Sequence, residues 1–149
     1  MAPLTQAEVD SLLAELGPHV ATKEKRIELG MAVYKKLFTA HPEYIQYFGK
    51  LQGLNKDTVF TSEGIKHYAG TLVDLLVEMV KHGANEAELK KLVEKNGKDH
   101  TGRKISKDQF MTGEAIFIDF FKSNLTKNEN KVAMEKFLKY IYPATASHI

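Results

Sequence analysis

Apolar residues recur at three- and four-residue spacing almost from one end of this chain to the other, and this periodicity constrains the fold more than any other feature. Strand-like alternation bounded by turn residues is hard to find. Because residues three and four apart lie on the same side of an α-helix, the pattern predicts amphipathic helices that each bury one face. We therefore expect an all-α protein.

Length and composition favour one domain. The chain has 149 residues and no cysteine, and it contains no internal repeat, low-complexity tract or Pro/Ser-rich linker. This length can bury a substantial core without disulfides. We expect a single domain over residues 1–149. Since neither a disulfide framework nor a secretory signal is indicated, we expect a cytoplasmic location.

The charge distribution argues against two classes of partner. A net charge of +2 arises from 21 basic and 19 acidic residues, with no concentrated basic field. Nucleic acid and anionic lipid both attract such fields, so we expect neither as a partner. The apolar stretch from Leu72 to Val80 is interrupted by Asp74 and Glu78. It falls well short of the roughly 20 apolar residues that span a bilayer.

Helix starts and stops can be placed from capping signals. Four pairs at three-residue spacing resemble capping boxes: Thr5 with Glu8, Asn85 with Glu88, Ser106 with Gln109, and Thr126 with Glu129. The expected helices, seven or eight in all, include one ending at Gly17-Pro18, one from about Thr22 to Thr39, a short one starting at Pro42, and others over about Ser62–His82, Glu86–His100, Lys107–Leu125 and Lys127–Tyr142. Pro143 is expected to stop the last.

Two of these helices carry a polar residue on the apolar face. In the 62–82 helix, Tyr68 lies on the same side as Ile65, Ala69, Leu72, Leu75, Leu76 and Met79. In the 86–100 helix, His100 extends a stripe formed by Leu89, Leu92, Val93 and Asn96. We therefore expect both side chains to point inward.

An inward neutral histidine must use both ring nitrogens. One donates, and the other accepts a hydrogen bond or binds a metal. The carbonyl of Asn96 and the carboxylate of Asp99 are the available acceptors for His100. From the helix alone, a packed core histidine and a metal ligand are equally good interpretations.

Several segments together resemble the globin family. Pro42 starts the short third helix, Phe48 follows six residues later, and His100 ends the helix that bears the iron ligand in that family. The segments Leu37–Glu43 and Ser62–Lys66 are also similar to globin sequences. Tyrosine at both Tyr34 and Tyr68 resembles the haemoglobins of parasitic flatworms (trematodes), as do residues 16–19, 37–42, 62–68 and 97–101.

The resemblance implies a globin fold with a haem pocket and a set of site residues. Haem b would be the cofactor, with His100 as its metal ligand and Tyr68 and Tyr34 on the oxygen side. The apolar residues expected to pack against the haem are Phe48, Phe38, Leu72, Ile105 and Phe110. The basic residues expected near the propionates are Lys50, Arg103 and Lys104.

The implied function is reversible binding of oxygen and other diatomic ligands by a protein that is not an enzyme. Two phenols that can donate to bound oxygen favour high affinity, for an oxygen store, scavenger or carrier. An alternative is a haem enzyme with peroxidase-like or nitric-oxide-dioxygenase activity, and another is a haem-free helical bundle that binds a partner. We expect a monomer. Ile118, Phe120 and Phe121 mark either an interface or a penultimate helix buried on more than one face.

Overall fold

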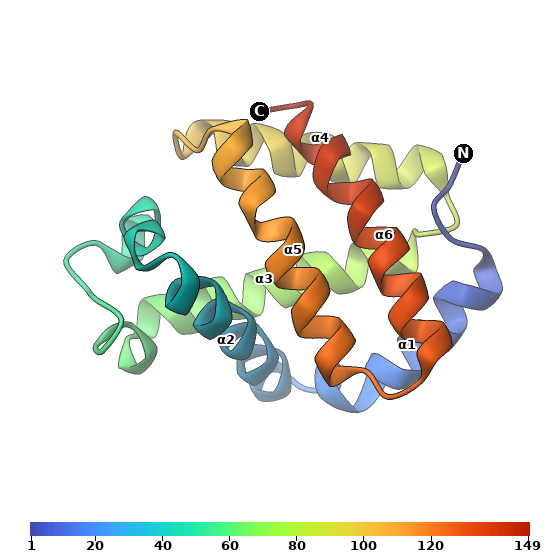
Figure 1. Ribbon diagram of the computed structural model, residues 1–149, viewed down its shortest axis with the longest axis horizontal. Coiled ribbons are helices and arrows are strands. Elements are labelled where there is room, and N and C mark those ends of the chain that lie inside the picture. The colour runs from blue at the N-terminus through green and yellow to red at the C-terminus, as the bar shows by residue number, and fades with distance from the viewer. The chain divides into compact units, whose positions relative to one another are not determined.

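The computed structural model describes residues 1–149 and contains α-helices and short 3₁₀-helices but no strand (Figure 1). In chain order the elements are α1 (Gln6–Val20), α2 (Lys23–Ala40), η1 (Pro42–Tyr47), η2 (Gly49–Leu51), η3 (Val59–Thr61), α3 (Glu63–Lys81), α4 (Glu86–Gly102), α5 (Lys107–Asn124) and α6 (Asn128–Ala146). The all-α prediction is confirmed. None of these helices combines the length and apolar content that a membrane span requires.

Two of the four predicted capping boxes are complete. At the start of α1, Thr5 N donates to Glu8 Oε1 and Glu8 N donates back to Thr5 Oγ1. Ser106 and Gln109 exchange the same pair of bonds at the start of α5. Each box satisfies two backbone groups that the first helical turn would otherwise leave without a partner.

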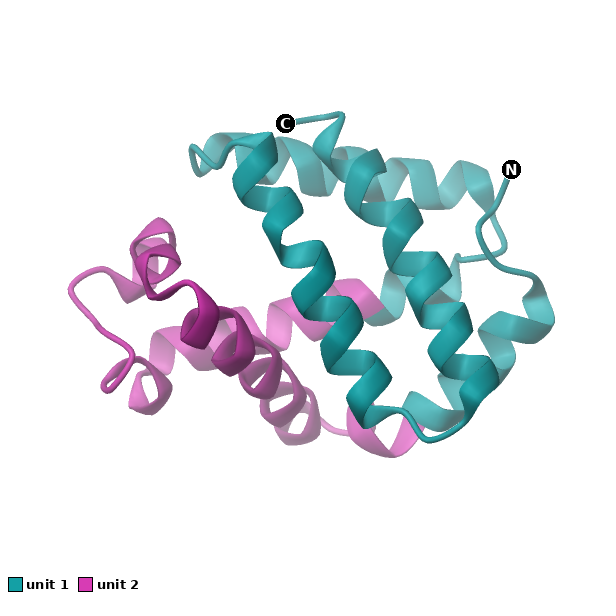
Figure 2. Cartoon of the chain, viewed as in Figure 1, with its two compact units in different colours: residues 1–16, 77–149 teal, residues 17–76 magenta.

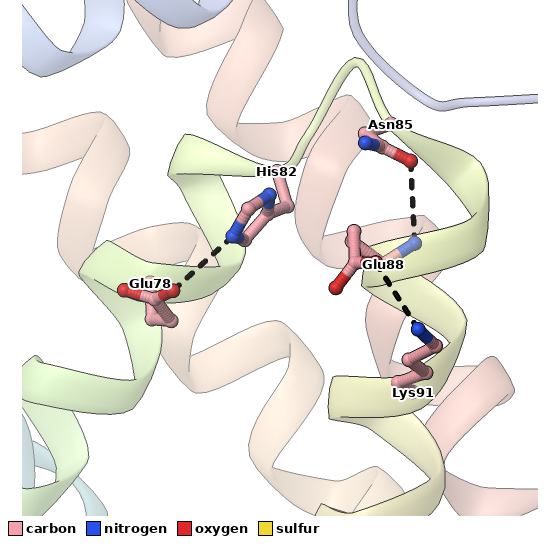
Figure 3. Close-up of polar contacts among 5 residues, drawn as sticks. All are labelled: Glu78, His82, Asn85, Glu88 and Lys91. Carbon is pink, nitrogen blue, oxygen red and sulfur yellow. Dashed lines mark hydrogen bonds and ion pairs between the residues drawn. The ribbon is translucent and has the colours of Figure 1, made fainter.

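The turn from α3 to α4 carries half of a third box. Figure 3 shows Glu88 N donating to Asn85 Oδ1 at 3.2 Å, while the Glu88 carboxylate pairs with Lys91 at 3.2 Å instead of reaching back. Just before the turn, His82 Nε2 lies 3.2 Å from Glu78 Oε1. Asn85 therefore caps α4 without the reciprocal bond.

The fourth predicted box, between Thr126 and Glu129, is wrong. The N-cap of α6 is Lys127, whose side chain makes no capping bond. Glu15 of α1 supplies the missing acceptor, because its carboxylate accepts from the backbone N–H groups of Thr126 and Lys127 and from the Asn130 amide. A residue more than a hundred positions away thus caps α6, which no local spacing could indicate.

Both proline-based helix ends are also wrong. Pro18 lies in the last turn of α1, which continues to Val20. Pro143 lies inside α6, which continues to Ala146. In α6 the proline removes one amide donor, but near the helix end this loss is small compared with the packing of the residues that follow. In α6, Thr145 and Ala146 are buried.

The chain divides into two compact units, one of residues 1–16 and 77–149 and the other of residues 17–76 (Figure 2). The division falls inside α1 and α3. The single domain over residues 1–149 stays a prediction. Each unit has its own buried apolar side chains.

In the unit of residues 1–16 and 77–149, α5 and α6 pack side by side and α4 packs against α6 (Figure 1). The largest fully buried side chains here are Leu12, Met79, Leu89, Phe121, Met134, Phe137 and Leu138. Ile118 and Phe120 are buried as well. Helix α5 therefore buries more than one face, and the group Ile118, Phe120 and Phe121 belongs to the core.

In the unit of residues 17–76, α2 and α3 touch through their backbones. A Cβ atom on Gly30 would collide with the Ala69 carbonyl, so only glycine permits this approach. Arg26 Nη1 and Asp74 Oδ1 form an ion pair of 2.7 Å between the same helices. The core of this unit includes Val33, Phe38, Ile45, Leu51, Val59 and Ile65.

The turn after α4 places one lysine in the left-handed backbone region. Lys104 has φ of 61° and is the one non-glycine residue of the chain with positive φ. Ile105 N donates to His100 O at 3.3 Å and Lys104 N to Thr101 O at 3.0 Å. These two bonds form a Schellman motif, in which the Lys104 position normally favours glycine.

We expect Glu15→Gln to destabilise the protein by about 1–2 kcal/mol at neutral pH, because it weakens the cap of α6. Burial raises the pKa of Glu15, but the hydrogen bonds from Thr126, Asn130 and Lys127 outweigh it and hold the pKa below its ordinary value of 4.5. Because the pKa of Glu15 is lower in the folded than in the unfolded protein, its ionised carboxylate stabilises the folded protein at pH values above the unfolded-state pKa. This stabilisation is lost as the pH falls through the folded-state pKa. Urea unfolding at several pH values measures it.

The matched control is Glu129→Gln, in the first turn of the same helix. It should change the free energy of unfolding by less than about 0.5 kcal/mol. The difference in the free energy of unfolding between Glu15→Gln and the parent protein should become smaller below about pH 4.5. Equal effects of the two substitutions would contradict the cap by Glu15.

We expect Lys104→Gly to raise the free energy of unfolding by about 0.5–1 kcal/mol, because glycine adopts positive φ without a steric cost. Lys104→Ala distinguishes the effect of backbone conformation from that of charge, since alanine keeps the Cβ atom and lacks the charged chain beyond it. Thermal and urea unfolding would measure both variants. A gain with alanine as large as that with glycine would show that charge, and not backbone conformation, is responsible.

Candidate functional site

His100 lies in the last turns of α4 and is half-buried. Its Nδ1 atom is 2.7 Å from the Asn96 carbonyl oxygen. A carbonyl can only accept, so Nδ1 carries the proton and donates, which leaves the lone pair of Nε2 available to a ligand. Asp99, the other acceptor considered from the sequence, lies 3.8 Å from Lys95 instead. No three His, Cys, Asp or Glu side chains are grouped so that they could hold a metal ion.

The surroundings of His100 favour the neutral ring. Burial lowers its pKa, the bond to Asn96 opposes this, and the nearby Arg103 guanidinium lowers the pKa further while Asp99 raises it. The net effect is a pKa below the usual histidine value. At neutral pH the imidazole is therefore uncharged, the form that binds metals.

Two aromatic rings extend from His100 in the same unit. The Phe110 ring lies edge-on to the imidazole with centroids 4.9 Å apart, and Tyr142 lies 4.9 Å beyond Phe110. Ile105, on the turn after α4, is half-buried. Arg103 and Lys104, also on this turn, are exposed. The structure thus brings His100, Phe110 and the turn of residues 103–105 together.

In the unit of residues 17–76, four predicted site residues form one aromatic cluster. Tyr34 stacks on Phe38 at 5.5 Å, and both rings meet Phe48 edge-on at 5.5 and 5.6 Å. Tyr68 contacts the other side of Phe48 at 5.0 Å. Phe38 is fully buried and also contacts Phe60. Helices α2 and α3 and the end of η1 together position this cluster.

The Tyr68 hydroxyl accepts a hydrogen bond from the backbone N–H of Lys50 at 3.1 Å. A phenol can donate and accept at once, so this bond does not use the proton of Tyr68. The next peptide group packs closely on the start of α3, because the Lys50 carbonyl oxygen would lie 2.6 Å from a Cβ atom at Gly64. Lys50 itself is exposed, and Leu72, one turn beyond Tyr68, is half-buried.

Both units keep some apolar side chains partly accessible. They are Phe48, Leu72 and Leu75 in one unit, and Leu92, Ile105, Phe110 and Met111 in the other. A completed core usually leaves such residues little exposed.

Sequence reasoning missed Tyr142, Gly97 and Phe60 as neighbours of the candidate site. Tyr142 was placed at a helix end before Pro143, although it continues the stripe of Met134 and Leu138 at four-residue spacing. Gly97 is an isolated glycine inside a helical pattern, which indicates close packing at that position. Phe60 lies in η3, where no periodic pattern exists to indicate its direction.

Solved structures of globins share this fold. Ferric myoglobin from Aplysia limacina matches with a TM-score of 0.80 and 20% identity, over 97% of this chain and 98% of the other. The globin-like protein GLB-1 of C. elegans matches with a TM-score of 0.78 and 22% identity, over 97% of this chain and 94% of the other. The predicted globin fold is confirmed.

Sequence comparison identifies the family. The Globin family profile matches residues 31–145. A globin from Isoparorchis hypselobagri is 44% identical over 98% of this chain and 99% of its own length. A globin from Dicrocoelium dendriticum is also 44% identical, over 99% of this chain and 98% of its own. The chain therefore belongs to the globin family, and this membership implies haem binding and supports a role in binding oxygen.

Proposed function

We propose that this protein binds haem b through His100 and holds oxygen and other diatomic ligands reversibly, with high oxygen affinity from tyrosine hydrogen bonds. The observation that carries the proposal is the His100 side chain. Its Nδ1–H group donates to the Asn96 carbonyl oxygen, with 2.7 Å between Nδ1 and the oxygen, and its burial favours the neutral ring. Such a bond fixes the ring and raises the basicity of the other nitrogen.

The residues present fit a haem. A single histidine ligand suits an iron whose four in-plane ligands come from a porphyrin. The partly accessible apolar side chains in each unit, among them Phe48, Leu72, Ile105 and Phe110, suit its faces. At roughly 25 cal/mol per Å² of apolar surface removed from water, covering them contributes more than a few polar edge contacts.

For the propionate groups we propose the basic residues Lys50, Arg103 and Lys104. All three are exposed. Arg103 is near enough to His100 to lower the pKa of its ring, which places positive charge beside the proposed ligand. Exposed ion pairs contribute little each, so these residues orient the cofactor more than they hold it.

When bound, ferrous haem supplies the centre that takes up oxygen. Tyr34 and Tyr68 would donate hydrogen bonds from their phenol groups to a bound diatomic ligand. A hydrogen bond to a charged group contributes about 1.5–3 kcal/mol, and about 1.4 kcal/mol is one decade of affinity. The buried ring of Tyr34, packed on Phe38, and the unused proton of Tyr68 support this role.

We propose a binding protein and not an enzyme. Peroxide chemistry needs a distal acid–base group that titrates near neutrality, which phenols do not. Tight binding suits an oxygen store, scavenger or carrier. The burial of Ile118, Phe120 and Phe121 supports a monomer.

Replacing His100 by glycine should abolish stable haem uptake, because it removes the proposed iron ligand. Added imidazole should restore the absorption spectrum by supplying the same ligand from solution. The control is His19→Ala, since His19 is exposed in the last turn of α1 and should take no part in haem binding. Unchanged haem uptake by the His100 variant, without imidazole, would contradict the proposed ligand.

Tyr34→Phe should speed oxygen dissociation by about tenfold or more, because it removes one donor to the bound ligand. Stopped-flow measurement on the reduced, haem-loaded protein gives this rate. Tyr44→Phe is the control, because Tyr44 stacks on His41 outside the aromatic cluster of Tyr34. An unchanged rate with Tyr34→Phe would overturn the donor role while leaving haem binding intact.

A further inference from the structure

We infer that residues Tyr142–His148, the last turn of α6 with the two residues after it, are a positioning element for His100. This inference rests on the proposed function, since it concerns how the proposed iron ligand is held. It is carried by three sets of contacts on α4 and α5, all within the unit of residues 1–16 and 77–149.

The first contact lies one helical turn before His100. Gly97 is buried, and a Cβ atom there would lie 2.5 Å from His148 Cβ and 2.6 Å from the Thr145 carbonyl oxygen. Because His148 Cβ and the Thr145 carbonyl oxygen are not at the far end of a flexible side chain, a change of rotamer cannot relieve this contact. The backbone of α4 is therefore seated directly on the end of α6.

The second contact lies one residue after His100. The Thr101 hydroxyl is 3.2 Å from the Gly97 carbonyl oxygen and 3.4 Å from the His148 carbonyl oxygen. One donor thus reaches both its own helix and the segment that follows α6. The backbone that carries His100 is held on both sides along α4.

The third contact reaches the ring itself. Phe110 meets the imidazole edge-on at 4.9 Å, and Tyr142 of α6 lies against Phe110 at 4.9 Å. Tyr142 is buried and packs closely on α5, because its hydroxyl would lie 3.0 Å from a Cβ atom at Gly113. Movement of the α6 end would therefore change both the backbone and the ring environment of His100.

A backbone-level substitution tests this inference. Gly97→Ala should push α4 away from α6 and alter the iron–histidine bond. We expect a shifted iron–histidine stretching band in the resonance Raman spectrum of the reduced protein. Oxygen dissociation should change by at least about threefold, within the range of coupling effects from residues that do not touch the ligand.

The matched control is Gly102→Ala, the same substitution at the end of the same helix. A Cβ atom at Gly102 meets nothing within 4 Å, so the band and the rate should stay as in the parent protein. Thr101→Val, which keeps the shape and removes the hydroxyl, is a milder variant for use if Gly97→Ala does not fold. It should shift the band in the same way but less.

A haem-free measurement separates this inference from the proposed function. In the apoprotein, Gly97→Ala should speed amide hydrogen exchange over residues 96–101, while α5 should keep its protection. If the parent protein takes up no haem, the proposed function fails, and the exchange result still tests the contact. A folded Gly97→Ala or Thr101→Val protein with parental Raman band, oxygen rate and exchange would overturn the inference.

Discussion

Close backbone contact at glycine is the constraint on which the arrangement inside each unit depends. Gly30 lets α2 meet the Ala69 carbonyl of α3, and Gly97 lets α4 meet Thr145 of α6. Glycine in a helix costs about 1 kcal/mol relative to alanine, so both helices give up intrinsic stability for proximity. Within one unit the contact at Gly30 sets the spacing of the helices that carry Tyr34 and Tyr68, and within the other the contact at Gly97 seats the helix that carries His100 on α6.

The chemistry open to the candidate site depends on which polar atoms of His100 and Tyr68 already take part in hydrogen bonds to the main chain. The Asn96 carbonyl takes the Nδ1 proton of His100, so the ring can bind through its other nitrogen only. The Tyr68 oxygen accepts from Lys50 and keeps its own proton. In each case a main-chain group settles which role remains for the side chain. Backbone geometry therefore decides which atom of each side chain is left for a ligand.

Local patterns predicted the helices well and their ends less well. The boxes at Thr5 and Ser106 formed because both partners lie within one turn. The cap of α6 could not be predicted, since Glu15 reaches it from α1. Periodicity placed His100 and Tyr68 on the correct helix faces but could not choose between ligand and packed core, because both uses bury the same face. The globin resemblance supplied that choice.

The bond between Tyr68 and Lys50 has a dynamic consequence. Lys50 belongs to η2, a single short turn of 3₁₀-helix, and its carbonyl is pressed against Gly64 at the start of α3. The Tyr68 oxygen lies on the axis about which the ring flips, so a ring flip keeps this bond, whereas a change of χ1 breaks it. A change in the direction of the Tyr68 side chain therefore requires the loss of a bond to the main chain of η2, whereas flipping of its ring does not.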